Sequence, residues 1–331
     1  MIQGLLIGFG IGVLLASAAV WFLLRRQARR IRAAERRARS AERMAEIGAM
    51  TSGLAHEIKN PLSTVGMNAQ LLLDGIQELP IEESERKPLV NRMSRPLDGI
   101  RVLDLTMMIA GPYCGRLLAD LGAEVAKIEP PEGDFTRLLA PVRDGCSTYF
   151  GHLNAGKKSL VLDLKSPAGR EAAQALVAKA DVLLENFRPG VVDRLGLGWA
   201  TTSKLNPRLV YCSISGYGQN GPARDRPAYA PIVHASSGYD LAVMALQPDQ
   251  KEPQSTAVMV ADILSGTFAF GAIQAALLER TRTGKGRLVD VPLIDAMLQL
   301  PLIEFQRAQF GEDDSRVAYR PVRSADGFVV I

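Results

Sequence analysis

The sequence predicts an α/β protein in which a Rossmann-like parallel sheet with flanking helices follows a transmembrane helix and a long cytoplasmic helix. Three observations support this prediction. Residues 5–24 are apolar and uncharged, residues 25–48 are rich in Arg, Ala and Glu with no Pro, and from Ile100 onward short apolar runs alternate with helical stretches. Strands that alternate with helices are typical of a parallel sheet with helices packed on it. We therefore expect three regions: 1–24, 25–92 and 93–331.

The first region has the properties of a membrane anchor. Its uncharged run is about as long as a helix needs to be to cross a hydrocarbon core. A signal peptide would normally carry positive charge before the apolar run, and here the arginines (Arg25, Arg26, Arg29 and Arg30) come after it. Positive charge on that side alone predicts that it faces the cytoplasm. We expect a single-pass protein of the inner (cytoplasmic) membrane with the residues after 24 in the cytoplasm.

The positive charge of the chain is concentrated in one segment. The formal net charge is +4, and nine Arg against two Glu fall between residues 25 and 43. Removing that excess of seven positive charges from +4 leaves −3 for the rest of the chain. A basic segment beside an apolar one favours membrane contact over a nucleic-acid surface, so we expect no nucleic-acid partner.

The cysteines and histidines predict neither disulfides nor a metal site. The three Cys and three His are scattered along the chain, and the cysteine spacing matches no disulfide framework and no zinc motif. Reduced cytosolic thiols and no bound metal are the expectation.

The second region predicts an amphipathic helix with an exposed histidine. An apolar stripe recurs at spacings of three and four (Ile47, Met50, Leu54 and Ile58), as one face of a helix requires. His56 lies off this stripe and Glu57 follows it. An exposed imidazole beside a carboxylate suits phosphoryl transfer, with the imidazole as nucleophile, although most isolated histidines have no such role.

Residues 54–62, with the sequence LAHEIKNPL, resemble the H-box of sensor histidine kinases. The resemblance covers about residues 1–92 and implies that His56 is the phosphoacceptor, that Glu57 assists, and that the helix pairs in a dimeric bundle. The sequence departs from that family because the second bundle helix only begins near residue 85 and no ATP-binding domain follows. Met93 could be the first residue of a separate protein. The chain is then either a natural fusion of two proteins or an artefact of sequence assembly, and both alternatives stay open.

The third region reads as alternating strands and helices. We predict strands at 100–105, 123–128, 159–162, 181–184 and 209–214, and helices at 113–121, 167–180 and 263–280. No GxGxxG or Walker-type loop follows the first strand, so neither NAD nor ATP is indicated.

Several segments of this region resemble class III CoA-transferases, the formyl-CoA transferase or CaiB/BaiF type. They occur in order along the chain, at residues 96–106, 110–112, 118–129, 133–137, 154–159, 181–190, 216–222, 260–266 and 284–291. The resemblance covers residues 96–331. It implies an enzyme that moves CoA from an acyl-CoA donor to a carboxylic acid acceptor, with the CoA thioester as substrate and no permanent cofactor.

The resemblance assigns the nucleophile to Asp262. In this family the matching carboxylate attacks the acyl-CoA thioester and passes through covalent aspartyl intermediates, which divide a difficult exchange into easier steps. From the residues alone, a simpler interpretation is that Asp262 caps the helix at 263–280. Both roles are compatible, because a helix N-terminus also stabilises a carboxylate.

The resemblance also implies a set of CoA contacts. Asn186, Phe187 and Arg194 match the segment that holds the nucleotide end of CoA, where a cation near phosphates and a ring against adenine are reasonable. Met107 and Ile109 match positions near the reacting carbonyl. Their side chains differ from the polar ones of the formyl-CoA enzyme, so a substrate other than that of the formyl-CoA enzyme is an open alternative.

Acyl-CoA racemases share this fold and are the alternative activity. They pair the matching Asp with a His, but here Tyr229 stands at the His position, which favours the transferase. Tyr229 is a candidate acyl contact, and His234 is expected to be structural.

Family members form interlocked homodimers and continue beyond the point that matches Ile331. We therefore expect a transferase domain that is incomplete at its C-terminus, with poor stability and little activity by itself. A non-functional fusion or truncated product is a further alternative.

Overall fold

The computed structural model describes residues 95–245, 251–254, 256–311, 321–323 and 328–330. The predicted membrane anchor at 5–24 and the predicted phosphoacceptor pair, His56 and Glu57, lie outside the described residues. Those predictions therefore stay predictions.

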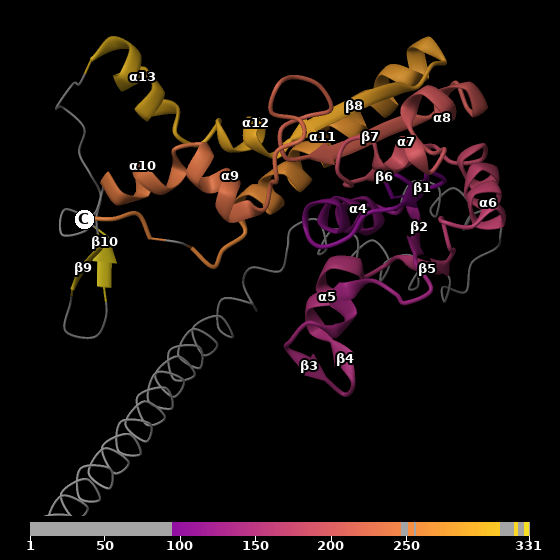
Figure 1. Cartoon of the computed structure of the whole chain (residues 1–331), viewed down its shortest axis with the longest axis horizontal. Coiled ribbons are helices and arrows are strands. Elements are labelled where there is room, and N and C mark those ends of the chain that lie inside the picture. Colours follow the sequence, from indigo (N-terminus) through magenta and orange to yellow (C-terminus); the bar gives the residue numbers. More distant parts are fainter. Residues whose placement is uncertain (1–94, 246–250, 255, 312–320, 324–327, 331) are drawn as a thin grey trace, which may run out of the picture. The chain divides into compact units, whose positions relative to one another are not determined.

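The described residues form a parallel sheet with helices on both faces (Figure 1). The strands are β1 (Arg101–Asp104), β2 (Glu124–Glu129), β3 (Val142–Arg143), β4 (Cys146–Ser147), β5 (Lys158–Val161), β6 (Val182–Glu185), β7 (Val210–Ser215), β8 (Arg287–Pro292), β9 (Pro321–Arg323) and β10 (Phe328–Val330). The helices are α4 (Ala110–Asp120), η1 (Phe135–Leu138), α5 (Thr148–Asn154), α6 (Pro167–Val177), α7 (Val191–Arg194), α8 (Trp199–Leu205), α9 (Ala230–Ser236), α10 (Tyr239–Ala245), α11 (Val260–Thr283), α12 (Leu293–Met297) and α13 (Leu302–Phe310).

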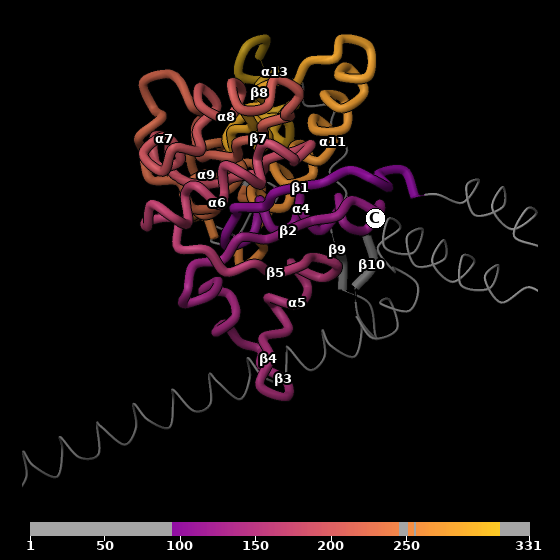
Figure 2. The backbone as a smooth tube through the Cα atoms, turned by 90° about the vertical axis from the view of Figure 1, so that its right-hand side faces the viewer, coloured from indigo at the N-terminus to yellow at the C-terminus, as the bar shows by residue number. Residues whose placement is uncertain are grey.

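The sheet has the strand order of a doubly wound fold. Six parallel strands run β5-β2-β1-β6-β7-β8, and β5, β2 and β1 lie side by side in Figure 2. The chain moves outward from β1 to β2 and β5, returns to β6 on the other side of β1, and continues to β8. The order reverses between β1 and β6, and folds of this kind bind their ligands in the crevice at that switch point.

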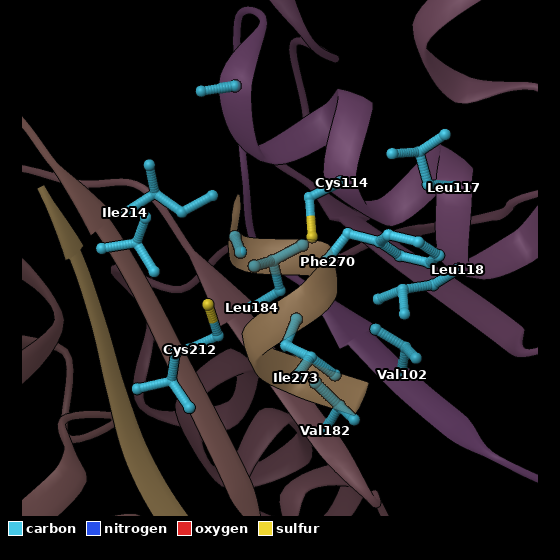
Figure 3. Close-up of a cluster of buried hydrophobic side chains, with 14 of the residues drawn as sticks. Val102, Cys114, Leu117, Leu118, Val182, Leu184, Cys212, Ile214, Phe270 and Ile273 are labelled. Carbon is cyan, nitrogen blue, oxygen red and sulfur yellow. The ribbon is translucent and has the colours of Figure 1, made fainter. Parts of the chain in front are cut away.

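The two faces of the sheet bury two separate hydrophobic clusters. Successive residues of a strand point to opposite faces, so Val102 packs against α4 and α11 while Leu103 packs against α6. Figure 3 shows the first cluster, in which Cys114 and Leu118 of α4 meet Phe270 and Ile273 of α11 over the central strands. Burial on both faces explains why these strands are nearly continuous apolar runs.

The longest helix belongs to this core. Among the described residues, α11 is the helix long and apolar enough to cross a membrane by length and composition. Its side chains Ala269, Phe270, Ile273 and Leu277 instead pack in the first cluster. We therefore assign it as the core helix of the domain.

The strands and helices predicted between residues 100 and 280 are confirmed with small shifts at their ends. The five predicted strands correspond to β1, β2, β5, β6 and β7. The third predicted helix begins at Val260 instead of 263, and α4 begins at Ala110 instead of 113. The sixth strand, β8, was not predicted.

Candidate active site

A cavity of about 740 Å³ opens at the switch point, beside the carboxyl ends of β1 and β6. Loops that follow β1, β6 and β7 form most of its wall, and Asp262 of α11 contributes its side chain. Its lining includes Met108, Ile109, Ala110, Tyr149, Asn186, Phe187, Arg188, Arg194, Arg224, Asp225, Arg226, Tyr229, Met259 and Asp262. A ligand would therefore bind where this fold class places its ligands.

Asp262 occupies the first turn of α11 and faces this cavity. The interpretation that Asp262 caps the helix is wrong, because the helix begins two residues earlier and its N-cap position is Met259. Burial raises the pKa of the Asp262 carboxyl to about 6, and a hydrogen bond donated by the Ala110 amide opposes that rise. The carboxyl is therefore mostly ionised at neutral pH but poorly hydrated, which suits a nucleophile.

Gly266 allows this arrangement because it lies one helical turn after Asp262, on the same face of α11. A β-carbon at Gly266 would lie 2.6 Å from the carbonyl oxygen of Ala110 and 3.2 Å from the Tyr113 ring. Only a glycine therefore lets α11 approach the start of α4 this closely. That approach brings the Ala110 amide within hydrogen-bonding reach of Asp262.

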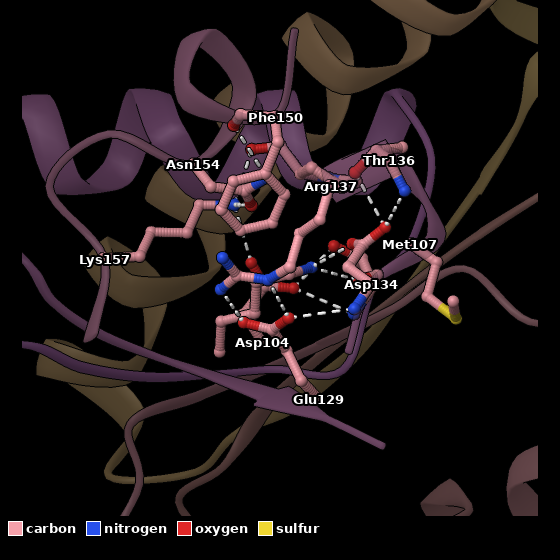
Figure 4. A network of polar contacts seen from close by, with 12 residues as sticks. Asp104, Met107, Glu129, Asp134, Thr136, Arg137, Phe150, Asn154 and Lys157 are labelled. Atoms are coloured by element: carbon pink, nitrogen blue, oxygen red, sulfur yellow. Dashed lines mark hydrogen bonds and ion pairs between the residues drawn. The ribbon is translucent and has the colours of Figure 1, made fainter. Parts of the chain in front are cut away.

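Two buried lysines fix the loop between β1 and α4, one near the start of the loop and one at the first turn of α4. Figure 4 shows the second, Lys157, in the network that includes Asp104. Lys127 donates to the carbonyl of Thr106 at 2.6 Å, and Lys157 donates to the carbonyl of Pro112 at 2.8 Å. Between these two points lies Met108, a non-glycine residue with a φ of 67°, a backbone conformation that costs energy and persists only where its surroundings enforce it. The network beneath the loop therefore holds the backbone that faces Asp262.

Two carboxylates, one at the end of β1 and one at the N-cap of η1, neutralise these lysines. Asp104 forms an ion pair with Lys157 at 2.8 Å and accepts hydrogen bonds from the amide and hydroxyl of Thr106. Burial by itself would raise the pKa of Asp104, but the neighbouring lysines lower it below its usual value. Lys127 forms an ion pair with Asp134 at 2.8 Å. Buried charges are tolerated when they are paired and hydrogen-bonded in this way.

Glu129 extends the network toward the surface. Burial favours a higher pKa for its carboxyl, but hydrogen bonds from Arg137, Ser159 and the Asp134 amide hold it at about 2. The Arg137 guanidinium also lies 3.9 Å from the centre of the Phe150 ring, within the range of a cation–π contact. These contacts anchor the segment that leads into α5, which carries Tyr149.

Asn186 joins the two loops across the switch point. Its side-chain oxygen accepts the Met107 amide at 2.9 Å, and its side-chain nitrogen donates to the Met107 carbonyl at 2.7 Å. Asn186 therefore fixes the position of the loop after β1, besides lining the cavity. The next residue, Phe187, donates its amide to Glu185 at 2.9 Å.

The structure brings six of the seven predicted transferase residues to one cavity: Ile109, Asn186, Phe187, Arg194, Tyr229 and Asp262. The seventh, Met107, does not line the cavity, but its backbone is held by Asn186. His234 does not line it either. It is buried at 1% exposure and accepts a hydrogen bond from the Ala261 amide, as expected of a structural residue.

Sequence reasoning missed Tyr149 and three arginines of the cavity wall. Tyr149 belongs to α5, and its pKa is raised by burial and by the charge of Asp262. Arg188, Arg224 and Arg226 line the cavity beside the predicted Arg194. Arg188 stands next to Phe187 in the sequence, so proximity could have indicated it. Only the tertiary fold brings Tyr149 near Asp262, so no local sequence signal could have indicated it.

Comparison with known proteins decides the family. The model of CoA-transferase family III matches residues 97–331, which include every residue of the cavity.

The chain belongs to CoA-transferase family III.

Several curated proteins that resemble this chain are named as CoA-transferases. The chain is 46% identical over 204 residues to an acetyl-CoA:oxalate CoA-transferase of Acetobacter aceti, a match that covers 61% of this chain and 52% of that protein. It is 38% identical over 248 residues to the succinyl-CoA:glutarate CoA-transferase of Mus musculus, covering 72% of this chain and 56% of that protein. The chain therefore spans about half the length of the curated relatives it matches.

A solved structure confirms the fold of this region. The crystal structure of a CaiB/BaiF family protein from Brucella suis superposes with a TM-score of 0.65 at 38% sequence identity. The match covers 72% of this chain and 66% of that one. The α/β architecture with a parallel sheet and flanking helices is thus shared with the family.

Proposed function

We propose that this protein moves CoA from an acyl-CoA donor to a carboxylic acid through covalent intermediates on Asp262. The observation that supports the proposal is the placement of Asp262. Its carboxyl is partly desolvated, stands in the first turn of a long helix, accepts the Ala110 amide and faces the cavity at the switch point.

In the first half of the proposed reaction, Asp262 takes the acyl group and then CoA. A carboxylate oxygen of Asp262 attacks the thioester carbonyl, the carbon–sulfur bond breaks, and an acyl-aspartyl anhydride and CoA thiolate form. The thiolate attacks the aspartyl carbonyl of the anhydride, and the donor acid leaves as its carboxylate. Asp262 then carries CoA as a thioester.

In the second half, the acceptor takes the CoA. A carboxylate oxygen of the acceptor attacks the aspartyl thioester, which expels CoA thiolate and forms a second anhydride. The thiolate attacks the acceptor carbonyl of that anhydride, so the new acyl-CoA leaves and the Asp262 carboxylate is restored. No step changes an oxidation state and none needs a metal ion.

The surrounding residues have matching roles in the proposal. The N-terminus of α11 and the amides of the loop after β1 stabilise negative charge that develops beside Asp262. Arg194 and Arg188 bind phosphate groups of CoA, and Phe187 packs against its adenine. Tyr229, which is 64% exposed, contacts the acyl group.

A small dicarboxylic acid is the proposed acceptor. The two relatives described above are named for oxalate and glutarate. Arg224, Asp225 and Arg226 line the cavity wall, and because Arg224 pairs with Asp225 at 3.5 Å, Arg226 supplies the net positive charge there. Cationic side chains favour a substrate that keeps one free carboxylate during the transfer.

The racemase alternative is less well supported. No histidine of the described residues lines the cavity, and Tyr229 occupies the position where a racemase base is expected. Exchange of the α-proton of an acyl-CoA with deuterated water, without CoA transfer, would favour the racemase.

The proposal is tested by a transfer assay on the full chain. Acetyl-CoA or succinyl-CoA is incubated with oxalate or glutarate, and the acyl-CoA products are separated by chromatography. We expect a new acyl-CoA with the wild-type chain and a loss of about a thousandfold or more with Asp262→Asn. A wild-type chain without transfer, or an equally active Asp262→Asn variant, would contradict the proposal.

The homodimer and the membrane anchor implied by the sequence are further proposals. Sedimentation of the detergent-extracted chain tests the dimer, and carbonate extraction of membranes tests the anchor at residues 5–24.

The H-box sequence around His56 supports a second candidate function, in which His56 accepts a phosphoryl group from a partner kinase. Acid-labile phosphate that disappears in His56→Gln would support it, and no such phosphate in the presence of that kinase would contradict it.

A further inference from the structure

Helix α11 begins without a capping side chain of its own. The first amides of a helix have no partner inside it, and Ser, Thr, Asp or Asn at the N-cap position usually accepts one of them. Here the N-cap residue is Met259, which makes no side-chain hydrogen bond. Val260 donates its amide to the nearby Val258 carbonyl at 3.0 Å, so the next amide, that of Ala261, needs an acceptor from elsewhere in the fold.

His234 of α9 supplies this acceptor. Its Nε2 atom accepts the amide of Ala261 at 3.1 Å, and its side chain is 1% exposed. An imidazole nitrogen that accepts a hydrogen bond carries no proton, so the neutral ring must hold its proton on Nδ1. Burial, and not a neighbouring charge, favours this neutral state. Asp240 of α10 is the charged group whose influence on His234 is resolved, and burial keeps the His234 pKa below its usual value in spite of it.

This hydrogen bond acts one residue away from the nucleophile. Ala261 is fully buried and directly precedes Asp262, so fixing the Ala261 amide fixes the backbone from which the Asp262 side chain projects. On its other side, the Asp262 carboxyl accepts the Ala110 amide. The first turn of α11 is therefore held between α9 and the first residue of α4.

We propose that His234 is a positioning residue, whose neutral Nδ1–H imidazole replaces the missing N-cap of α11 and orients Asp262 toward the cavity. The catalytic consequence rests on the proposed transferase function, whereas the hydrogen bond and the tautomer do not. A residue displaced by about an ångström from its reactive position can lose about a hundredfold in rate. Loss of the His234 acceptor should act in this way.

Two substitutions at His234 separate positioning from packing. The side-chain oxygen of Gln can accept the same amide, whereas Leu fills similar space without an acceptor. We expect His234→Leu to lower kcat by about 10- to 100-fold with a smaller change in KM, and His234→Gln to restore most of that loss. The matched control is His152→Leu, because His152 lies outside the cavity wall and its loss should leave transfer unchanged.

Nitrogen-15 spectra of the full chain test the contact without any activity. The chain has only three histidines, so His234→Gln and His152→Leu assign their signals. We expect an unprotonated Nε2 and a protonated Nδ1 for His234 at pH 7. We also expect the carbon-13 titration of the Asp262 carboxyl to shift in His234→Leu but not in His234→Gln.

The outcomes distinguish the two proposals. A protonated Nε2 at pH 7, or an Asp262 titration that is the same in wild type and His234→Leu, would overturn the positioning role. The expected tautomer and titration shift in a chain that transfers no CoA would support the role of His234 and contradict the transferase function. Transfer that is unaffected by His234→Leu would also overturn positioning.

Discussion

Replacing Asp262 with Asn should stabilise the folded protein at neutral pH while it removes the proposed activity. The pKa of the Asp262 carboxyl rises from 3.8 to about 6 on folding, chiefly because of burial. The folded chain therefore binds a proton more readily than the unfolded chain, and this carboxyl lowers stability progressively as pH rises from about 4 to 6. An Asn side chain has no such charge to desolvate, and its oxygen can still accept the Ala110 amide.

The size of the effect follows from the two pKa values. The carboxyl costs the folded state less than about 1 kcal/mol at pH 4, about 2 kcal/mol at pH 5 and about 3 kcal/mol at pH 7. Urea unfolding of wild type and Asp262→Asn at these three pH values measures the difference. Asp98→Asn, at an exposed surface position, controls for the loss of one negative charge. If Asp262→Asn is no more stable than wild type at pH 7, or if its advantage does not grow with pH, the reasoning about burial is refuted.

Three further predictions concern the same site. CoA transfer requires the ionised Asp262 carboxyl, so kcat/KM should fall as pH drops below about 6, and a pH–rate profile that stays flat to pH 5 would contradict this. Lys157→Met should destabilise the fold by about 3–5 kcal/mol in urea unfolding because Asp104 is left buried without its ion pair, and a loss under about 1 kcal/mol would argue against the network. Gly266→Ala should cost about 1–3 kcal/mol and reduce transfer, because its β-carbon would lie 2.6 Å from a carbonyl oxygen of α4. Gly271→Ala in the same helix has open space and should be neutral or slightly stabilising, so equal effects of the two substitutions would contradict the close-approach argument.

The central strands could be predicted from the sequence, and of the two edge strands β5 was predicted and β8 was not. β1, β6 and β7 are covered on both faces and therefore consist of apolar runs. β8 lies at the edge of the sheet, begins with Arg287, and has both exposed and buried side chains. The apolar run at residues 160–162 made the other edge strand, β5, recognisable, whereas Asp290 interrupts the apolar residues of β8.

The site could be predicted only in part, because its contacts join residues far apart in the chain. The resemblance to the family identified Asp262, but local sequence suggested a capping role that the start of α11 at Val260 excludes. The acceptor for that helix is His234, 27 residues away in sequence. Likewise, the hydrogen bonds between Asn186 and Met107 span 79 residues, and only the strand order places those two loops together.

Hydroxylamine trapping tests the central claim most directly. The full chain is incubated with an acyl-CoA, treated with hydroxylamine, digested and examined by mass spectrometry for an aspartyl hydroxamate. A covalent aspartyl anhydride or thioester predicts the modification on Asp262, dependent on acyl-CoA and absent from Asp262→Asn. CoA transfer that proceeds with no modified Asp262, or with the modification on another residue, would contradict the proposed nucleophile.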